Sequence, residues 1–273
     1  MTSSVEPRWN TKITDASAAG VRIRGYGLSD LAKEADFASV FYLLVVGELP
    51  TQAQGRALNA VMISACDRGI TPSSAISRTV ASCGSPLQAA VAAGVLTFGD
   101  VQGGVGIEMG NGLLRVISDL SGEVDQKSDE AIAAATAFVT HYEDRGERIP
   151  GYGQPLHPDG DPRAKELIDY AFELGVDGNA LAVGLAAETV IEERKGRPIP
   201  MNVDGAIACI AIDIGMPAEI IRAINFVARA AGLSAHVLEE METARGFRLL
   251  ATDDEVNYEG VAARAVPTGE DRE

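Results

Sequence analysis

The sequence of 273 residues holds few cysteines, and their scarcity excludes two classes of small stabilised protein. Only Cys66, Cys83 and Cys209 occur, widely spaced and without a CxxC pair. This spacing supports neither a disulfide framework nor a zinc site, and we predict no bound metal. Each cysteine lies among small apolar residues. We therefore expect all three to fill the core rather than to act as nucleophilic thiolates.

Basic residues are also scarce, which argues against anionic partners of large size. The chain carries 23 Lys and Arg against 39 Asp and Glu, a formal net charge of −16. Such a balance disfavours nucleic-acid binding by phosphate neutralisation and docking on an anionic membrane surface. The N-terminus lacks the apolar core of a signal peptide, and no stretch offers about 20 charge-poor apolar residues for a membrane span. We expect a cytoplasmic protein.

The hydrophobic pattern is helical along nearly the whole chain. Apolar residues recur at i, i+3, i+4 and i+7 within residues 37–44 and 58–65, which predicts two amphipathic helices. Asp161-Pro162 and Ser85-Pro86 are typical of helix starts. Runs of alternating β-branched residues are missing, so strands should contribute little. The expected fold class is all-α.

Three helical segments, residues 86–98, 178–194 and 205–215, are rich in Ala and apolar on every side. Helices of this kind are buried, either inside the chain or at a subunit interface. We expect both, and hence a homodimer.

Glycine and proline mark two loops with different expected roles. The cluster at residues 103–110 does not have GxGxxG spacing and does not follow a strand, so we expect a tight turn there. The Gly/Pro-rich segment 144–153 separates two helical stretches and is a candidate hinge or ligand-facing loop.

Three charged positions are candidates for a site, each with a simpler alternative. Arg163 lies early in a helix, where the dipole does not favour a cation; it binds an anion or is a solvated surface residue. Asp204 opens an apolar helix and is either an N-cap or a partly desolvated base with a raised pKa. Arg229 and His236 share a helix face, where a lone histidine is more often a satisfied core residue than a catalyst.

Five segments of the sequence form one ordered set. They are the RGY-x-x-x-x-LA element at 24–32, FASVFYLLVVGELPT at 37–51, GYGxPxHxxxDPRA at 151–164, Asn202-Val203-Asp204, and RxxGxxAH at 229–236. Together and in this order they resemble the citrate synthase superfamily, from about residue 21 to residue 248. Within the superfamily, residues 96–104 and Asp204-Gly205 look more like citryl-CoA lyases and the lyase module of ATP-citrate lyase than full-length synthases.

The resemblance implies a large helical domain, a small helical domain and chemistry at the carbon next to an acyl-CoA thioester. The large domain is expected at residues 19–106 and 201–261 and the small one at 107–200, with flexible ends at 1–18 and 262–273. Coenzyme A would be substrate or product, no other cofactor is implied, and the second partner would be a small carbonyl compound or carboxylic acid.

The resemblance also assigns roles to individual residues. Asp204 matches the base that removes the α-proton, and the loop residues Pro150, Gly151, Tyr152 and Gly153 match the backbone that binds CoA. The expected substrate-binding residues are Arg163, Arg229, His157, Arg68 and His236.

Three positions depart from the family pattern. Gln102 and Gln154 stand where the family has its two catalytic histidines, and Arg68 stands where it has a third. A glutamine amide donates a hydrogen bond but does not carry a proton near neutral pH. The expected activity is carbon–carbon bond cleavage or formation of the citryl-CoA lyase or citrate synthase type, on a substrate that need not be citrate. The alternative is a non-catalytic CoA-binding paralogue.

Overall fold

The computed structural model describes residues 8–103, 105–154, 160–243, 246–248 and 251–266. Helices dominate this part of the chain, which confirms the all-α prediction. In chain order its elements are β1 (Thr14–Ser17), β2 (Gly20–Ile23), β3 (Tyr26–Gly27), α1 (Leu28–Glu34), α2 (Phe37–Val46), α3 (Gln52–Cys66), α4 (Pro72–Ser82), α5 (Leu87–Val95), α6 (Val105–Ile117), α7 (Asp129–Glu143), α8 (Pro162–Leu174), α9 (Asn179–Lys195), α10 (Val203–Asp213), the 3-10 helix η1 (Ala218–Ile220), α11 (Ile221–Thr243) and the 3-10 helix η2 (Asp253–Glu255).

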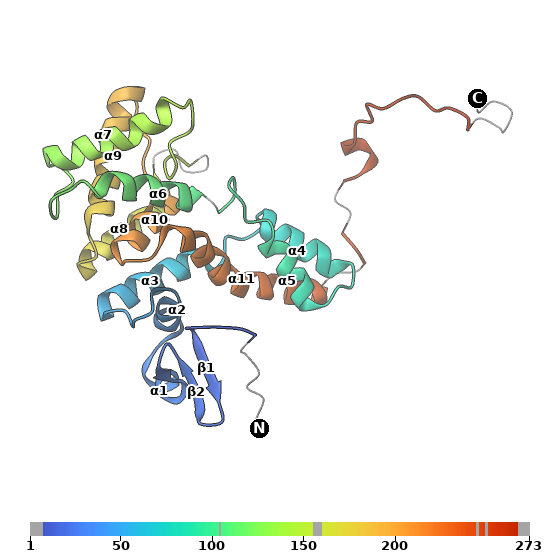
Figure 1. Cartoon of the computed structure of the whole chain (residues 1–273). Helices are drawn as coiled ribbons and strands as arrows, with labels where there is room; N and C mark the ends of the chain where they lie inside the picture. The colour runs from blue at the N-terminus through green and yellow to red at the C-terminus, as the bar shows by residue number, and fades with distance from the viewer. Residues whose placement is uncertain (1–7, 104, 155–159, 244–245, 249–250, 267–273) are drawn as a thin grey trace.

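The helices form one body from which both ends of the chain depart. In Figure 1, α6 to α10 gather on one side and α11 extends from them to α4 and α5 on the other. Residues 251–266 run away from this body (Figure 1), with η2 as their regular element. Within the described residues, no helix combines the length and the apolarity that crossing a membrane requires. The division into a large and a small domain stays a prediction.

Helix α10 lies at the centre of the core. Nearly all of its residues are buried, and it packs against α6, α8 and α9. Its apolar sequence is therefore accounted for within one chain, as is most of α9. The prediction of burial is confirmed for α9 and α10, and α10 gives no argument for a subunit interface. It does not hold within this chain for the segment 86–98, because only Ala90 and Gly94 of α5 are buried against neighbouring helices.

The N-terminal hairpin was not expected. Strands β1, β2 and β3 form an antiparallel sheet in the order β1-β2-β3, with Thr14 opposite Ile23. The turns use Gly20 and Gly25, whose φ angles of +128° and +90° suit glycine. Almost every strand residue is exposed, so the alternation that marks a half-buried strand is missing. The predicted flexible segment 1–18 therefore overlaps a strand.

Two helix boundaries also differ from prediction. Helix α5 begins at Leu87, with Pro86 in an extended N-cap conformation, and ends at Val95. The glycine cluster is a turn only as far as Gly103, because α6 already contains Gly106 and Gly110. A Cβ at either position would come within 2.7 Å of Ile221 side-chain atoms, so these glycines serve a close contact between α6 and α11.

The cysteines only partly follow the core prediction. Cys209 is buried in α10 and Cys66 is half-buried. Cys83 is exposed, because it is the C-cap residue of α4 and lies where the helix leaves its neighbours. The expectation that all three fill the core was wrong for Cys83.

Candidate active site

A cavity of about 390 Å³ brings together side chains from distant parts of the sequence. Its walls come from the end of α3, the turn after α5, and the starts of α8 and α10, with α11 behind. Its lining includes the charged and polar side chains of Arg68, Gln102, Arg163, Asp204 and Arg229, together with the aromatic ring of Phe98.

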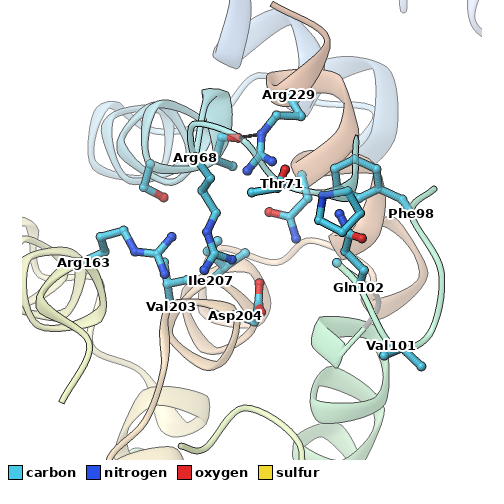
Figure 2. A pocket seen from close by; sticks show the side chains of 15 residues that line it. Arg68, Thr71, Phe98, Val101, Gln102, Arg163, Val203, Asp204, Ile207 and Arg229 are labelled. Carbon is cyan, nitrogen blue, oxygen red and sulfur yellow. Dashed lines mark hydrogen bonds between the residues drawn. The ribbon is translucent and has the colours of Figure 1, made fainter. Parts of the chain in front are cut away.

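Asp204 is not the N-cap of α10. That place belongs to Asn202, whose Oδ1 accepts hydrogen bonds from the backbone N–H groups of Asp204 (3.0 Å) and Gly205 (3.1 Å). The Asp204 carboxylate is thereby left to face the cavity (Figure 2). Burial raises the pKa of Asp204, and the charges of Arg68, Arg163 and Arg229 oppose this shift. A carboxylate in such surroundings suits a base better than a cap.

Arg163 is positioned by Asp161, the N-cap of α8. The Asp161 carboxylate, fully buried, accepts hydrogen bonds from Arg163 Nε (3.0 Å) and Nη2 (2.7 Å). It also accepts the backbone N–H of Val203 at 3.2 Å. Burial acts to raise the pKa of Asp161, but the Arg163 guanidinium and these backbone donors hold it below its usual value. The pair therefore joins the starts of α8 and α10 while Arg163 lines the cavity.

Arg229 is held from two sides. Its side chain comes from α11 and its Nε donates to the Ala65 carbonyl at 2.7 Å. Its guanidinium carbon lies 5.9 Å from the centre of the Phe98 ring, within cation–π range. The residue is only 7% exposed, and burial lowers its pKa.

Arg68 and Gln102 complete the walls from two turns. Arg68 follows the end of α3, and within the part of the chain that the structure describes it forms no ion pair. Gln102 lies on a turn closed by a hydrogen bond from Gly99 N to its carbonyl (2.9 Å). A Cβ on Gly103 would come within 2.5 Å of Phe98, so this turn needs a glycine beside the ring.

The cavity is positive in a strongly acidic protein. Figure 2 shows the guanidinium groups of Arg68, Arg163 and Arg229 turned toward the same space as the Asp204 carboxylate. Three arginines against Asp204 and Asp161 leave one net positive charge there, whereas the chain carries −16. Such a contrast favours a small anionic ligand.

A second cavity, of about 500 Å³, contains part of the predicted CoA loop. Tyr152, Gly153 and Gln154 line it together with three cationic side chains, Arg148, Lys195 and Arg197, and two carboxylates, Glu143 and Glu147. Gln154 thus lines this cavity and not the one that holds Asp204.

The loop backbone is less available than its glycines suggested. Gly153 N donates to the Pro200 carbonyl (2.9 Å), and its own carbonyl accepts from Asn202 Nδ2 (2.9 Å). Pro150 and Gly151 are buried and do not line the cavity. The φ of Gly151 is +85°, and a Cβ there would strike Met109 Sδ at 2.1 Å. The expected free N–H groups are therefore partly used in fixing the loop to the start of α10.

Of the two candidate histidines, His236 does not line the first cavity, and His157 lies outside the described residues. His236 contacts Asp67 and Arg78 instead of the cavity (Nε2 to Asp67 Oδ1, 2.9 Å). Sequence reasoning missed the pairing role of Asp161, the ring of Phe98 and the cations of the second cavity; only Asp161, three residues before Ala164 in the loop motif, had a local signal. Among the described residues no cluster of His, Cys, Asp or Glu could hold a metal ion.

Comparison with known proteins identifies relatives of this architecture. The sequence model of the family "Citrate synthase, C-terminal domain" matches residues 52–250. The citrate synthase of Haloferax volcanii is 28% identical over 88% of this chain and 61% of its own length. The putative citrate synthase 2 of Mycobacterium tuberculosis is 30% identical over 70% of this chain and 49% of its own length. The chain thus spans only about half to three fifths of these curated relatives.

Solved structures extend the comparison to the whole fold. The citryl-CoA lyase from Hydrogenobacter thermophilus superposes with a TM-score of 0.85 at 36% identity, covering 96% of this chain and 98% of that one. ATP citrate lyase from Methanothrix soehngenii, solved with citrate and coenzyme A, has a TM-score of 0.74 at 20% identity and covers 98% of this chain and 43% of its own. At that identity the second match shows the fold alone.

Proposed function

This chain belongs to the citrate synthase family, and from that premise we propose that it makes or breaks a carbon–carbon bond next to the thioester of an acyl-CoA, in the manner of citryl-CoA lyase. The observation that carries the proposal is the meeting of Arg68, Arg163, Arg229 and Asp204 in one cavity. Two solved structures match this chain over nearly their whole length, a citryl-CoA lyase at 36% identity and a citrate synthase at 16%, and the higher identity favours the lyase branch.

The acid half of the substrate is proposed to lie among the arginines. Arg229 is fixed by Ala65 and Phe98, and Arg163 by Asp161, so both guanidinium groups are oriented before a ligand arrives. Preorganised arginines bind carboxylates at a low entropic cost. Arg68 adds the charge that makes the cavity positive while Asp204 is ionised. A di- or tricarboxylic acid fits this arrangement.

Asp204 is proposed to move the proton of the reaction. In the bond-forming direction it takes a proton from the carbon next to the thioester carbonyl, and the resulting enolate carbon attacks the carbonyl of the acid. In cleavage the electron pair of the broken bond becomes the enolate, which takes a proton back from Asp204. Gln102 is proposed to donate its amide N–H to the enolate oxygen, because a neutral donor stabilises an oxyanion without carrying a proton.

The hydroxyl proton of a citryl-type substrate has a different route. We read Gln102 and Gln154 as replacements for the family histidines, so neither accepts a proton near neutral pH. In cleavage that proton therefore passes to solvent through the open cavity.

Coenzyme A is proposed to occupy the second cavity. Arg148 and Arg197 supply cations for its phosphate groups, and within the described residues neither of them forms an ion pair. Lys195, by contrast, is engaged with Glu143. The two cavities are lined by neighbouring segments: Asn202 N donates to the Gly151 carbonyl at 2.9 Å, the next loop residue, Tyr152, lines the second cavity, and Asp204 lines the first. The thioester would extend from the second cavity past these segments toward Asp204.

The test is exchange of the α-protons of acetyl-CoA with deuterated solvent, followed by mass spectrometry, together with cleavage of citryl-CoA. We expect exchange at protein concentrations that saturate binding. CoA binding without exchange across a panel of short acyl-CoAs would favour the non-catalytic alternative. Calorimetry showing no heat with CoA and acetyl-CoA at millimolar concentration would contradict the CoA site itself.

A homodimer in the cytoplasm remains part of the proposal. Its structural support is exposed apolar surface on and after α5, where Leu96 is 83% and Val101 97% exposed. Such surface is costly to leave in water. Light scattering at micromolar concentration is expected to give the dimer mass, and a monomer would contradict the assembly. Cell fractionation tests the location.

A further inference from the structure

One face of α11 contacts three successive residues at the end of α3, from Ala65 to Asp67. Arg229 Nε donates to the Ala65 carbonyl at 2.7 Å. Gly232 lies so close to the Cys66 carbonyl that a Cβ there would come within 2.2 Å of it. His236 Nε2 lies 2.9 Å from Asp67 Oδ1. Positions 229, 232 and 236 share a helix face because they are three and four residues apart. This face therefore fixes the point at which the chain leaves α3.

Asp67 links α11 to the turn that contains Arg68. It is the C-cap of α3, and its Oδ2 accepts the backbone N–H of Gly69 at 2.9 Å. Gly69 has a φ of +64°, so the chain turns sharply there. The Asp67 carboxylate therefore makes two contacts around Arg68: Oδ1 faces His236 on α11, and Oδ2 closes the turn by accepting from Gly69. Arg68 has no ion pair of its own within the described residues, so the direction of its side chain depends on the backbone of the turn at residues 67–69.

The ring of His236 is itself held in one orientation. Arg78 Nη1 lies 3.4 Å from His236 Nδ1, and because a guanidinium only donates, Nδ1 accepts and Nε2 carries the proton given to Asp67. Arg78 comes from α4 and is fixed by Glu240, whose carboxylate is fully buried (Nε to Oε2, 2.7 Å). Burial of Asp67 acts to raise its pKa, but Gly69 and His236 hold it below its usual value.

We propose that His236 is a positioning residue: through Asp67 it holds the turn at residues 67–69 so that Arg68 points into the cavity and binds a carboxylate of the substrate. The inference builds on the proposed function, because it assigns a substrate group to Arg68. It also explains why a histidine that does not line the cavity lies on the same helix face as Arg229.

A double-mutant cycle on citrate binding, measured by calorimetry, tests the route through Arg68. Arg68→Ala is expected to weaken citrate binding about tenfold or more, as for loss of a charge-assisted contact. His236→Leu should weaken it about three- to tenfold in the wild-type background and less than about twofold beside Arg68→Ala, since coupled residues are not additive. His236→Gln, whose amide can still donate to Asp67, should restore binding to within about twofold.

Two further measurements separate positioning from general damage. His141→Ala is the matched control, since His141 lies on α7 and contacts Arg145 and Tyr142, far along the chain from this turn; it should leave citrate binding unchanged. Hydrogen exchange of a peptide covering residues 66–72 should accelerate in His236→Leu, whatever ligand the protein binds. If His236→Leu does not fold, Asp67→Asn, which weakens the same pair from the other side, replaces it.

The outcomes divide cleanly. Equal effects of His236→Leu with and without Arg68, or unchanged exchange at residues 66–72, would overturn the positioning role. Faster exchange and a non-additive cycle, in a protein that shows no acyl-CoA chemistry, would retain the positioning role and overturn the proposed function. Faster exchange with no citrate binding by the wild type would overturn the assignment of Arg68 to a carboxylate.

Discussion

Helix α10 carries a carboxylate at each end, and the two ends differ in what surrounds them. Asp204, near the N-terminal end, faces a cavity lined by three arginines. Asp213, its last residue, accepts the backbone N–H groups of Ala180 and Leu181, both at 2.9 Å. It caps α9 from another helix, because the N-cap position is Gly178, where a Cβ would come within 2.6 Å of Asp213 Oδ1.

Burial raises the pKa of both carboxylates, that of Asp213 to about 6. A raised pKa therefore does not by itself identify a base. The oxygens of Asp213 are occupied by backbone donors, whereas those of Asp204 face a space where cations could hold an anionic substrate. The comparison teaches that the surroundings, not the pKa, separate a candidate catalytic carboxylate from a structural one.

Neutralising each carboxylate in turn tests whether Asp204, and not Asp213, takes part in the chemistry. Asp204→Asn is expected to lower α-proton exchange by about 10² to 10⁴, because general-base catalysis is lost while the shape of the residue is kept. Asp213→Asn should retain exchange in its folded fraction. Mass spectrometry of acetyl-CoA in deuterated solvent checks both, with CoA binding as the control. Undiminished exchange in Asp204→Asn would remove Asp204 from the chemistry.

The arginines offer the same contrast between structure and binding. Arg163→Gln leaves the buried Asp161 without its partner and is expected to lower the free energy of unfolding by about 2 kcal/mol, less than for a fully buried pair because Arg163 is partly exposed. Arg68→Gln should change stability by less than about 0.5 kcal/mol, since an exposed side chain without an ion pair supports little. Urea unfolding of both variants checks this. If Arg68→Gln lost more stability than Arg163→Gln, Arg68 would be the structural arginine and Arg163 the one free to bind the ligand.

The sequence predicted most helices because their apolar period is visible in the residues themselves. It missed the β1-β2-β3 hairpin, whose residues are exposed on both faces and so show no period of two. It also treated the apolar surface of α10 as partly intersubunit, although the neighbouring helices of the same chain cover it. Periodicity reports that a helix is buried but not which element buries it.

The candidate site shows the same limit. Asp204, Arg163, Arg229, Gln102 and Arg68 do meet in one cavity, as the resemblance implied. His236 shares a helix face with Arg229, yet its partner is Asp67, a contact between α11 and α3 that no local pattern encodes. Gln154 lies on the predicted loop but lines the second cavity. Spacing fixes the face on which a side chain lies, and only tertiary packing decides what it meets.

The pH dependence of stability sharpens the comparison of the two carboxylates further. Because the pKa of Asp213 is about 6 in the folded protein, above its ordinary value of 3.8, the native state holds its proton more tightly than the unfolded chain. Its stabilising contribution is present below about pH 4 and is lost as the pH rises through 6. Relative to Asp213→Asn, the wild type should therefore gain about 1 kcal/mol between pH 7 and pH 5.

Urea unfolding of the wild type and Asp213→Asn at both pH values measures that difference. Parallel pH profiles for the two proteins would show that the pKa of Asp213 is not raised in the folded protein, and would contradict the statement that burial raises the pKa of both carboxylates.

The smallest expected effect concerns Phe98, whose ring contacts both an arginine of the cavity and a second aromatic ring. Its ring lies 5.9 Å from the Arg229 guanidinium and meets Phe226 edge-on at 6.5 Å between ring centres. Phe98→Leu removes the aromatic face, so citrate binding should weaken about two- to fivefold, the range of an exposed to partly buried cation–π contact, and Phe98→Tyr should restore it.

Phe226→Leu, at a ring that does not line the cavity, is the matched control: it should lower the melting temperature comparably and leave citrate binding unchanged. If both leucine variants weaken binding equally, Phe98 acts through general packing, and Arg229 is oriented by its hydrogen bond to Ala65 alone. If only Phe98→Leu does so, the aromatic ring fixes the arginine for the anion.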